Sequence, residues 1–355
     1  MYRKLFSFPL LILMIAPACS SKTKKTNNET AAQALAPTVI SEQVGYDTDD
    51  PAIWINPADA TKSLIVGTDK HSDGGLYVFN LEGKIVQKIT GLQRPNNVDI
   101  AYGLVLNGQP TDIAVLTERE TGKIRIYSLP GLKELDHGGI SVFEGETEHF
   151  PMGISLYTRP ADNHIFAVVG RKSGPADGYL WQYELADDGT GNVKATVVRK
   201  FGKYSGKKEI ESIAVDNELG YIYYSDEQYG IHKYYASPDK GNQELALFGQ
   251  KDFQEDIEGI SIYKHADGTG YLLVSNQQAN TFNVYPREGT AQNAQEHALI
   301  TSIPFSTLES DGSDVTNVAL GPQFPKGLFV AMTNGKTFHF YDWQKIQARI
   351  SAQVK

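Results

Sequence analysis

A unit of about 50 residues recurs six times along the chain, and this repeat constrains the fold more than any other feature. Each unit starts with a short apolar run beside an acidic or amide residue, and it ends in an alternating run that closes on Tyr or Phe. The six starts lie at residues 50–54, 97–100, 152–155, 211–214, 257–260 and 314–317. Self-similarity at this period is typical of β-propellers, in which each repeat forms one four-stranded blade. The sequence therefore predicts an all-β, six-bladed propeller with antiparallel blades.

The apolar runs inside the units have the alternation of strands, with Gly, Asn and Asp at the breaks. Residues 75–79 (GLYVF) and 220–224 (GYIYY) are examples. The sixth unit ends near Trp343, too early for a full fourth strand. We expect the extended segment at residues 38–40 to complete that blade and close the ring, leaving only short protected edges. An open all-β fold or two sandwiches is the alternative.

The first residues have the pattern of an export signal. Arg3 and Lys4 precede an apolar run at residues 5–15, which is shorter than the roughly 20 residues of a membrane span. Small residues then lead to Cys19, the only Cys in the chain. This arrangement resembles a bacterial lipoprotein signal, in which the Cys is lipidated and becomes the mature N-terminus. An ordinary signal peptide with an incidental Cys is the alternative.

The domain organisation follows from this reading. Residues 1–18 are expected to be a lipoprotein-type signal peptide, residues 19–36 a flexible tether, and residues 37–355 a single propeller. We expect an exported protein, either periplasmic or held at the outer membrane or cell surface by a lipid on Cys19; free secretion is the alternative. Nothing in the sequence requires an oligomer, so a monomer is expected.

Composition excludes several classes of protein. Hydrophobic residues make up 41% of the chain, which is too many for a disordered protein. One Cys cannot form an internal disulfide, and no Cys/His zinc spacing is present. The formal net charge of −9 argues against a nucleic-acid partner, which requires a basic face.

Acidic and amide residues recur at the start of the first run and after the second run of the units. In a propeller these positions converge at one end of the central channel. The set comprises Asp49, Asp50, Asn97, Asp99, Glu211, Asp226, Glu227, Asp256, Glu258, Asn276, Gln277, Asp311 and Asp314. So many carboxylates in one place would repel one another, and Ca²⁺ binds six to eight such hard oxygen ligands. The pattern predicts several calcium ions. The alternative is that these side chains only satisfy backbone groups in turns.

Basic residues follow the apolar second run in three units. They are Lys70, Arg119, Arg171 and Lys172. Basic side chains beside bound calcium suit a polyanion such as a phosphate ester, which Arg can grip through two hydrogen bonds. The alternative is that they are ordinary surface charges on polar loops.

Five separated motifs together resemble the β-propeller phytases. They are DDPAIW at residues 49–54, NNVDI at 96–100, DIEGI at 256–260, ADGTGYLL at 266–273 and GPQFPKGLFV at 321–330. The resemblance covers roughly residues 47–343. It departs from the family pattern at Met152, where a Tyr is common, and at Ser212, where a Gly is common.

The resemblance implies a six-bladed, calcium-dependent enzyme that releases phosphate from myo-inositol hexakisphosphate (phytate), which would bind as its calcium complex. It implies a cleavage site beside an affinity site, with calcium ions bridging the phosphate and the attacking water. Glu211, Asp256, Glu258, Asp311, Asp314, Asn97 and Asp99 correspond to positions at the calcium centre, as do Asp226, Glu227 and Gln277. Lys70 and Arg119 correspond to phosphate-gripping positions, and a third falls on Arg171 or Lys172.

Two other functions remain open at this point. One is a different calcium-dependent propeller hydrolase, such as a lactonase or a phosphotriesterase, with a less basic pocket. The other is a propeller without catalytic activity that binds protein or glycan at the cell surface. For the phytase reading, water rather than a protein side chain is the expected nucleophile, with Lys70, Arg119 and Arg171 or Lys172 stabilising the phosphoryl oxygens.

Overall fold

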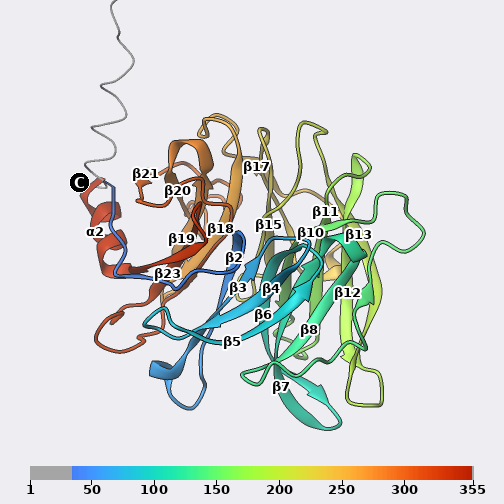
Figure 1. Ribbon diagram of the computed structural model, residues 1–355. Helices are drawn as coiled ribbons and strands as arrows, with labels where there is room; N and C mark the ends of the chain where they lie inside the picture. The colour runs from blue at the N-terminus through green and yellow to red at the C-terminus, as the bar shows by residue number, and fades with distance from the viewer. Residues whose placement is uncertain (1–33, 354–355) are drawn as a thin grey trace, which may run out of the picture. The chain divides into compact units, whose positions relative to one another are not determined.

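The structure is a computed structural model that describes residues 34–353, so the expected signal peptide and most of the expected tether lie outside the described residues. Its 24 strands pair into six four-stranded antiparallel sheets (Figure 1). Sheet 1 contains β2 (Thr48–Trp54), β3 (Leu64–Asp69), β4 (Gly74–Phe79) and β5 (Ile85–Leu92). Sheet 2 contains β6 (Pro95–Leu106), β7 (Gln109–Glu118), β8 (Lys123–Leu129) and β9 (Ile140–Ser141). Sheet 3 contains β10 (Pro151–Thr158), β11 (Ile165–Arg171), β12 (Asp177–Asp187) and β13 (Val193–Lys203).

The remaining sheets repeat this order. Sheet 4 contains β14 (Ile213–Asp216), β15 (Tyr221–Asp226), β16 (Gly230–Tyr235) and β17 (Ala246–Phe248). Sheet 5 contains β18 (Ile257–Lys264), β19 (Gly270–Asn276), β20 (Thr281–Pro286) and β21 (Thr301–Pro304). Sheet 6 contains β22 (Ser313–Thr316), β23 (Leu328–Thr333), β24 (Thr337–Asp342) and β1 (Val39–Ile40). The short 3-10 helices are η1 (Ala60–Lys62), η2 (Arg119–Thr121), η3 (Pro238–Lys240) and η4 (Gln277–Ala279), and the one described α-helix is α2 (Trp343–Gln353).

The hydrophobic core consists of six clusters, each between two neighbouring sheets. The cluster between sheet 6 and sheet 1 contains Phe338 and Phe340 from β24 with Ile65 and Phe79 from β3 and β4. Because apolar packing runs from every sheet to the next and from the last to the first, the sheets form a ring. The predicted six-bladed β-propeller is confirmed.

The outer strand of sheet 6 comes from the other end of the domain. In β1, Val39 lies opposite Phe340 of β24, and the flanking Thr38 and Ser41 donate backbone hydrogen bonds of 2.7 and 2.9 Å to β24. Leu35, at the end of the segment expected to be a tether, is buried in the cluster that also contains Trp343 and two Ile side chains of α2. Figure 1 shows α2 beside the last strands of the chain.

The first strands of the sheets bend where the acidic motifs lie. Register shifts fall between Thr48 and Pro51, between Pro95 and Val98, and between Ile257 and Ile260. A bulge of this kind re-aims the side chains beside it. Consecutive polar residues in these strands consequently face different surroundings.

Candidate active site

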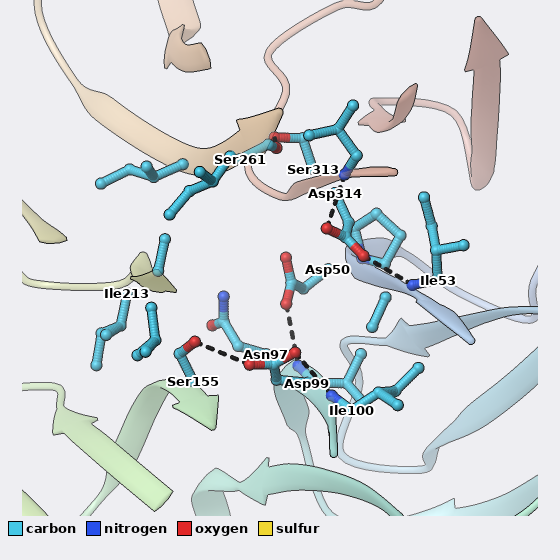
Figure 2. Close-up of a pocket in the computed structure, with 18 of the residues that line it drawn as sticks. Asp50, Ile53, Asn97, Asp99, Ile100, Ser155, Ile213, Ser261, Ser313 and Asp314 are labelled. Carbon is cyan, nitrogen blue, oxygen red and sulfur yellow. Dashed lines mark hydrogen bonds between the residues drawn. The ribbon is translucent and has the colours of Figure 1, made fainter. Parts of the chain in front are cut away.

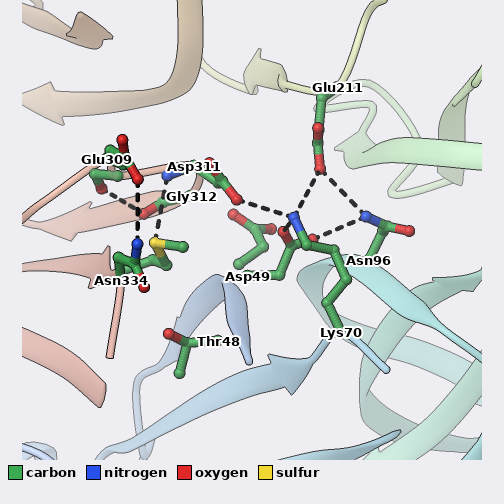
Figure 3. Close-up of polar contacts among 12 residues, drawn as sticks. Thr48, Asp49, Lys70, Asn96, Glu211, Glu309, Asp311, Gly312 and Asn334 are labelled. Atoms are coloured by element: carbon green, nitrogen blue, oxygen red, sulfur yellow. Dashed lines mark hydrogen bonds and ion pairs between the residues drawn. The ribbon is translucent and has the colours of Figure 1, made fainter. Parts of the chain in front are cut away.

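The Lys70 ammonium group lies among three carboxylates that come from different sheets. Its Nζ is 2.9 Å from Asp311 Oδ2 and 3.8 Å from Glu211 Oε1, and it also pairs with Asp49 (Figure 3). Asn96 connects two of these acids, because its Nδ2 donates to Asp49 Oδ2 at 3.0 Å and to Glu211 Oε1 at 3.2 Å. The topology thus brings together acids that are up to 262 positions apart (Asp49 to Asp311, 311 − 49).

A second set of carboxylates continues from Glu211. Oxygen atoms of Glu209, Glu211 and Glu227 lie within 4.8 Å of one another, and so do those of Glu227, Asp256 and Glu258. Glu211 also belongs to the Lys70 group, so all these acids form one continuous set. We call it the carboxylate cluster: Asp49, Glu209, Glu211, Glu227, Asp256, Glu258 and Asp311.

Side-chain amides hold parts of the carboxylate cluster in place. Gln277 donates to Asp311 Oδ1 at 2.5 Å, and Gln278 donates to Asp256 Oδ2 at 2.7 Å. Gln228 donates to the other Asp256 oxygen at 2.8 Å. These bonds fix where the carboxylate oxygens point.

Crowding in the carboxylate cluster disfavours the charged forms. Burial raises the pKa of Glu258 well above its usual range, and the nearby Glu227 and Glu211 raise it further. Burial raises the pKa of Glu227 to about 8, although Lys208 opposes the shift. The pKa of Glu211 is raised for the same reason, against the effect of Lys70. Asp256 differs, because its burial is outweighed by hydrogen bonds from Lys208 and Gln228, which lower its pKa. Cations bound among the glutamates would favour their charged forms.

The donor set of the carboxylate cluster fits a hard divalent cation. Its ligand atoms are carboxylate oxygens with neighbouring amide oxygens, as Ca²⁺ prefers. Glu258 Oε2 is buried and accepts no hydrogen bond from residues 34–353, so one ligand position is already free of a protein donor. No Cys or His belongs to either close-packed carboxylate group found among the described residues.

Two more basic side chains lie beside the carboxylate cluster. Arg119, in η2, is near enough to Asp49 and Glu211 to oppose the rise in their pKa, and its buried Nε has no hydrogen-bond partner in the described chain. Lys172 pairs with Glu209, and its side chain is 46% exposed. Both groups are placed to meet an anion at the cluster.

Arg171 occupies a different environment from its neighbour Lys172. Its guanidinium is buried, donates to Glu148 O at 3.1 Å and to Gly178 O at 3.3 Å, and lies 4.7 Å from the centre of the Phe143 ring. These contacts place Arg171 in the wall of sheet 3.

Four of the predicted metal-binding residues lie in the central channel instead. Asp50, Asn97, Asp99 and Asp314 line a cavity of about 230 Å³ to which all six first strands contribute (Figure 2). Each acid accepts a backbone N–H of a neighbouring first strand: Val98 N to Asp50 at 3.0 Å, Leu156 N to Asp99 at 2.7 Å and Ile53 N to Asp314 at 2.8 Å. These acids connect adjacent blades.

The channel acids are also shifted in pKa. Burial raises the pKa of Asp314 to about 7, with the nearby Asp99 adding to the effect. Burial raises the pKa of Asp50 well above its usual range and also raises that of Asp99. Asn97 Oδ1 is buried and accepts no hydrogen bond from the described residues.

Asp226, another predicted metal ligand, is committed to internal hydrogen bonds. It accepts from Ser205 N at 2.6 Å and from Ser205 Oγ at 2.7 Å, and His232 Nε2 lies 3.4 Å away. Asp226 therefore anchors the segment between β13 and β14, which carries Glu209 and Glu211.

Sequence reasoning missed several residues of this site, among them Asn96, Lys208 and Glu209. A signal for Glu209 is present, because residues two apart in an extended segment face the same side and Glu211 was selected. Asn96 is adjacent to Asn97 in the same motif. Lys208 gives no signal, because lysines on polar segments are common.

Comparisons with known proteins identify the family of the chain. A curated 3-phytase of Bacillus subtilis (strain 168) is 31% identical in an alignment that covers 94% of this chain and 90% of that protein. Among solved structures, the Dos1 propeller matches with a TM-score of 0.44 and 10% identity, over 83% of this chain and 67% of that one. The profile of the phytase family matches residues 4–349. The chain belongs to the phytase family.

Proposed function

We propose that this phytase hydrolyses phosphate esters of phytate with calcium ions bound in the carboxylate cluster. The observation that carries the proposal is the convergence of seven acids with Lys70, Arg119 and Lys172 at one place. A polyanion approaching acids alone would be repelled. With divalent cations on the acids and three basic side chains beside them, the same place attracts phosphate groups.

The residues that would hold calcium are those with converging oxygen atoms. They are Glu209, Glu211, Glu227, Asp256, Glu258 and Asp311, with Gln277 as a neighbouring amide. When bound, calcium supplies charge neutralisation of phosphate oxygens and a lowered pKa for a coordinated water. Asp50, Asn97, Asp99 and Asp314 are proposed to take a separate cation in the channel.

The protein's own groups then position the ester. Lys70 and Arg119 would contact the equatorial phosphoryl oxygens and stabilise the charge that spreads over them in the transition state. Water would attack phosphorus in line and release a proton to solvent, the bond from phosphorus to the inositol oxygen would break, and that oxygen would take up a proton from solvent. Lys172 is the better candidate than Arg171 for the third phosphate contact, because its ammonium group reaches the carboxylate cluster.

Calcium-dependent release of phosphate is the test. The purified protein is incubated with sodium phytate in calcium, in magnesium and in excess EDTA, and phosphate is measured. Release that needs calcium and stops on chelation is expected. A folded protein that releases no phosphate at any calcium concentration would contradict the proposal, and lactones and phosphotriesters would then be tried as substrates.

The position of first cleavage can be measured in the same experiment. Because the Bacillus subtilis relative is a 3-phytase, we propose that the phosphate at position 3 is removed first. NMR of the first inositol pentakisphosphate product identifies the free hydroxyl. A different free position would contradict this assignment and leave the reaction class intact.

We also propose that the protein is exported and anchored through a lipid on Cys19. Support comes from the sequence of residues 1–19, which lie outside the described residues. Among the described helices, none is long and apolar enough to cross a bilayer. Metabolic labelling with a fatty acid is expected to mark the wild-type protein, and labelling of a Cys19→Ala variant would contradict the proposal.

A further inference from the structure

We infer that the Lys208 ammonium group is an internal counter-ion of the carboxylate cluster, and that a divalent cation must displace it to bind Glu227 and Asp256. This inference rests on the proposed function, since it concerns the same cation site. It assigns a role to a residue that neither the sequence motifs nor the family resemblance selected.

The contacts of Lys208 are those of a bound cation. Its Nζ lies 2.7 Å from Glu227 Oε2 and 2.7 Å from Asp256 Oδ2. Both carboxylates belong to the close-packed group with Glu258, whose oxygens converge within 4.8 Å. The ammonium group thus contacts two of the three carboxylates that would ligate a metal ion.

Glu258, the third acid of this group, indicates that the site suits a cation of higher charge. Glu258 is 3% exposed, and its Oε2 accepts no hydrogen bond from any described residue. An ammonium group carries one charge and contacts two of the three acids, whereas a divalent cation can bind all three. Since both cations draw on the carboxylates of Glu227 and Asp256, they compete for the same two acids.

The Lys208 side chain can move into solvent, whereas Asp256, which it contacts, is held in place. It lies in the segment between β13 and β14, and its side chain is 37% exposed. Asp256, by contrast, is held by Gln228 and Gln278 through hydrogen bonds of 2.8 and 2.7 Å. The lysine can swing into solvent while the oxygens stay in position. The displaced ammonium then adds positive charge at the edge of a site for a polyanion.

Lys207 offers a matched control. It carries the same charge on the same segment, but its Nζ donates to the Gln228 backbone carbonyl at 3.0 Å and lies 5.1 Å from the centre of the Tyr229 ring. A change at Lys207 removes a positive charge near the site without removing a competitor from it.

Calcium titration calorimetry on purified wild type, Lys208→Gln and Lys207→Gln tests the inference. Lys208→Gln is expected to bind calcium about tenfold more tightly at one site, a change of about 1.4 kcal/mol. Lys207→Gln is expected to stay within about threefold of wild type. In EDTA, Lys208→Gln should melt at a lower temperature than Lys207→Gln, because only it leaves Glu227 and Asp256 without a cation.

A charge-retaining variant keeps the test decisive if Lys208→Gln folds poorly. Lys208→Arg is expected to bind calcium within about threefold of wild type, and tenfold tighter binding by it would contradict charge competition. Equal calcium affinities for Lys208→Gln and Lys207→Gln would also overturn the inference. If the wild-type protein binds no calcium at all, the proposed function fails. If the wild-type protein binds calcium but Lys208→Gln and Lys207→Gln bind it with equal affinity, only the Lys208 inference fails.

Discussion

Glu258 lies in an environment unlike that of an ordinary glutamate. It is buried beside other acids, and one of its oxygens lacks a hydrogen bond within residues 34–353. A buried charge without a partner is costly, so natural sequences retain one where it has a task. The position of Glu258 beside Glu227 and Asp256 suits a role in binding a cation.

Replacing Glu258 by Gln should separate activity from stability. The amide keeps the shape but removes the charge, so kcat/KM for phytate in saturating calcium is expected to fall by about 100-fold or more. The melting temperature in EDTA should stay level or rise, because repulsion within the carboxylate cluster decreases. Phosphate release and thermal melts measure the two effects.

The exposed Glu82→Gln is the control for Glu258→Gln, since it makes the same chemical change on the surface. It should leave both quantities unchanged. Full activity in Glu258→Gln would show that this carboxylate takes no part in catalysis.

Single elements connect distant parts of the ring, and the segment leading into β1 is an example. Leu35 pairs with Phe305 near sheet 5, and a few residues later β1 pairs with β24 of sheet 6. Leu35 is 8% exposed and Ile40 is 55% exposed, although both are large apolar residues in the same short segment. Their burial, rather than their hydrophobicity, should set their contribution to stability.

Leu35→Ala and Ile40→Ala form a matched pair for this point. Leu35→Ala is expected to lower the free energy of unfolding by about 2–4 kcal/mol, because it leaves a cavity beside Phe305 and Ile346. Ile40→Ala should change it by less than about 0.5 kcal/mol. Urea unfolding measures both. Equal losses would mean that the segment is not packed as described.

The junction between sheets 4 and 5 contains a buried histidine that should govern acid stability. His297 Nδ1 lies 2.7 Å from the Pro286 carbonyl and its Nε2 lies 3.1 Å from Lys233 Nζ, an arrangement that suits the neutral ring. Burial, together with the charge of Lys233, lowers the pKa of His297 to about 4. Between pH 6.5 and 4 the unfolded chain therefore binds more protons than the folded one. Stability falls as the pH drops through this window.

His297→Gln should reduce this acid sensitivity. Between pH 7 and pH 4.5 the wild-type protein is expected to lose about 2–3 kcal/mol through this residue, and the variant should lose correspondingly less. Urea unfolding at both pH values measures the difference. His149→Gln, at an exposed histidine, should behave like wild type, and an unchanged pH dependence in His297→Gln would contradict the assignment.

At the scale of the whole molecule, the ring and the carboxylate cluster depend on each other. Acids from four of the six repeats converge at one end, so their repulsion opposes closure of the ring. Under the proposed function, cations bound there would reverse the sign of this effect, because they would bind the folded arrangement and not the unfolded chain.

Calcium should therefore stabilise the whole domain. At about 100 times the dissociation constant, one site contributes about 2.7 kcal/mol, and the melting temperature is expected to rise by about 5 °C or more relative to EDTA. Magnesium should give a smaller rise, since it requires a tighter octahedral geometry. Identical melting temperatures in calcium and in EDTA would contradict calcium binding in the folded protein.

The repeat alone was enough to predict the architecture. Six units with the alternation of strands require six sheets, and apolar runs on both faces of a sheet require neighbours on both sides. The residue types at the unit starts also favour a particular chemistry, because carboxylates and amides with interspersed Lys and Arg suit hard cations and phosphate. These conclusions depend on composition and period, which are properties of the sequence itself.

Only the tertiary structure decided which of these residues share a site. Asp49 contacts Lys70 in the carboxylate cluster, whereas the adjacent Asp50 faces the central channel. Lys172 contacts Glu209 of the carboxylate cluster, whereas the adjacent Arg171 is buried within sheet 3. Neighbours in a strand point to opposite faces, and the bulges at the first strands shift this alternation by one residue. Which face each acid meets depends on a register fixed by packing between blades, and no local pattern in the sequence contains that register.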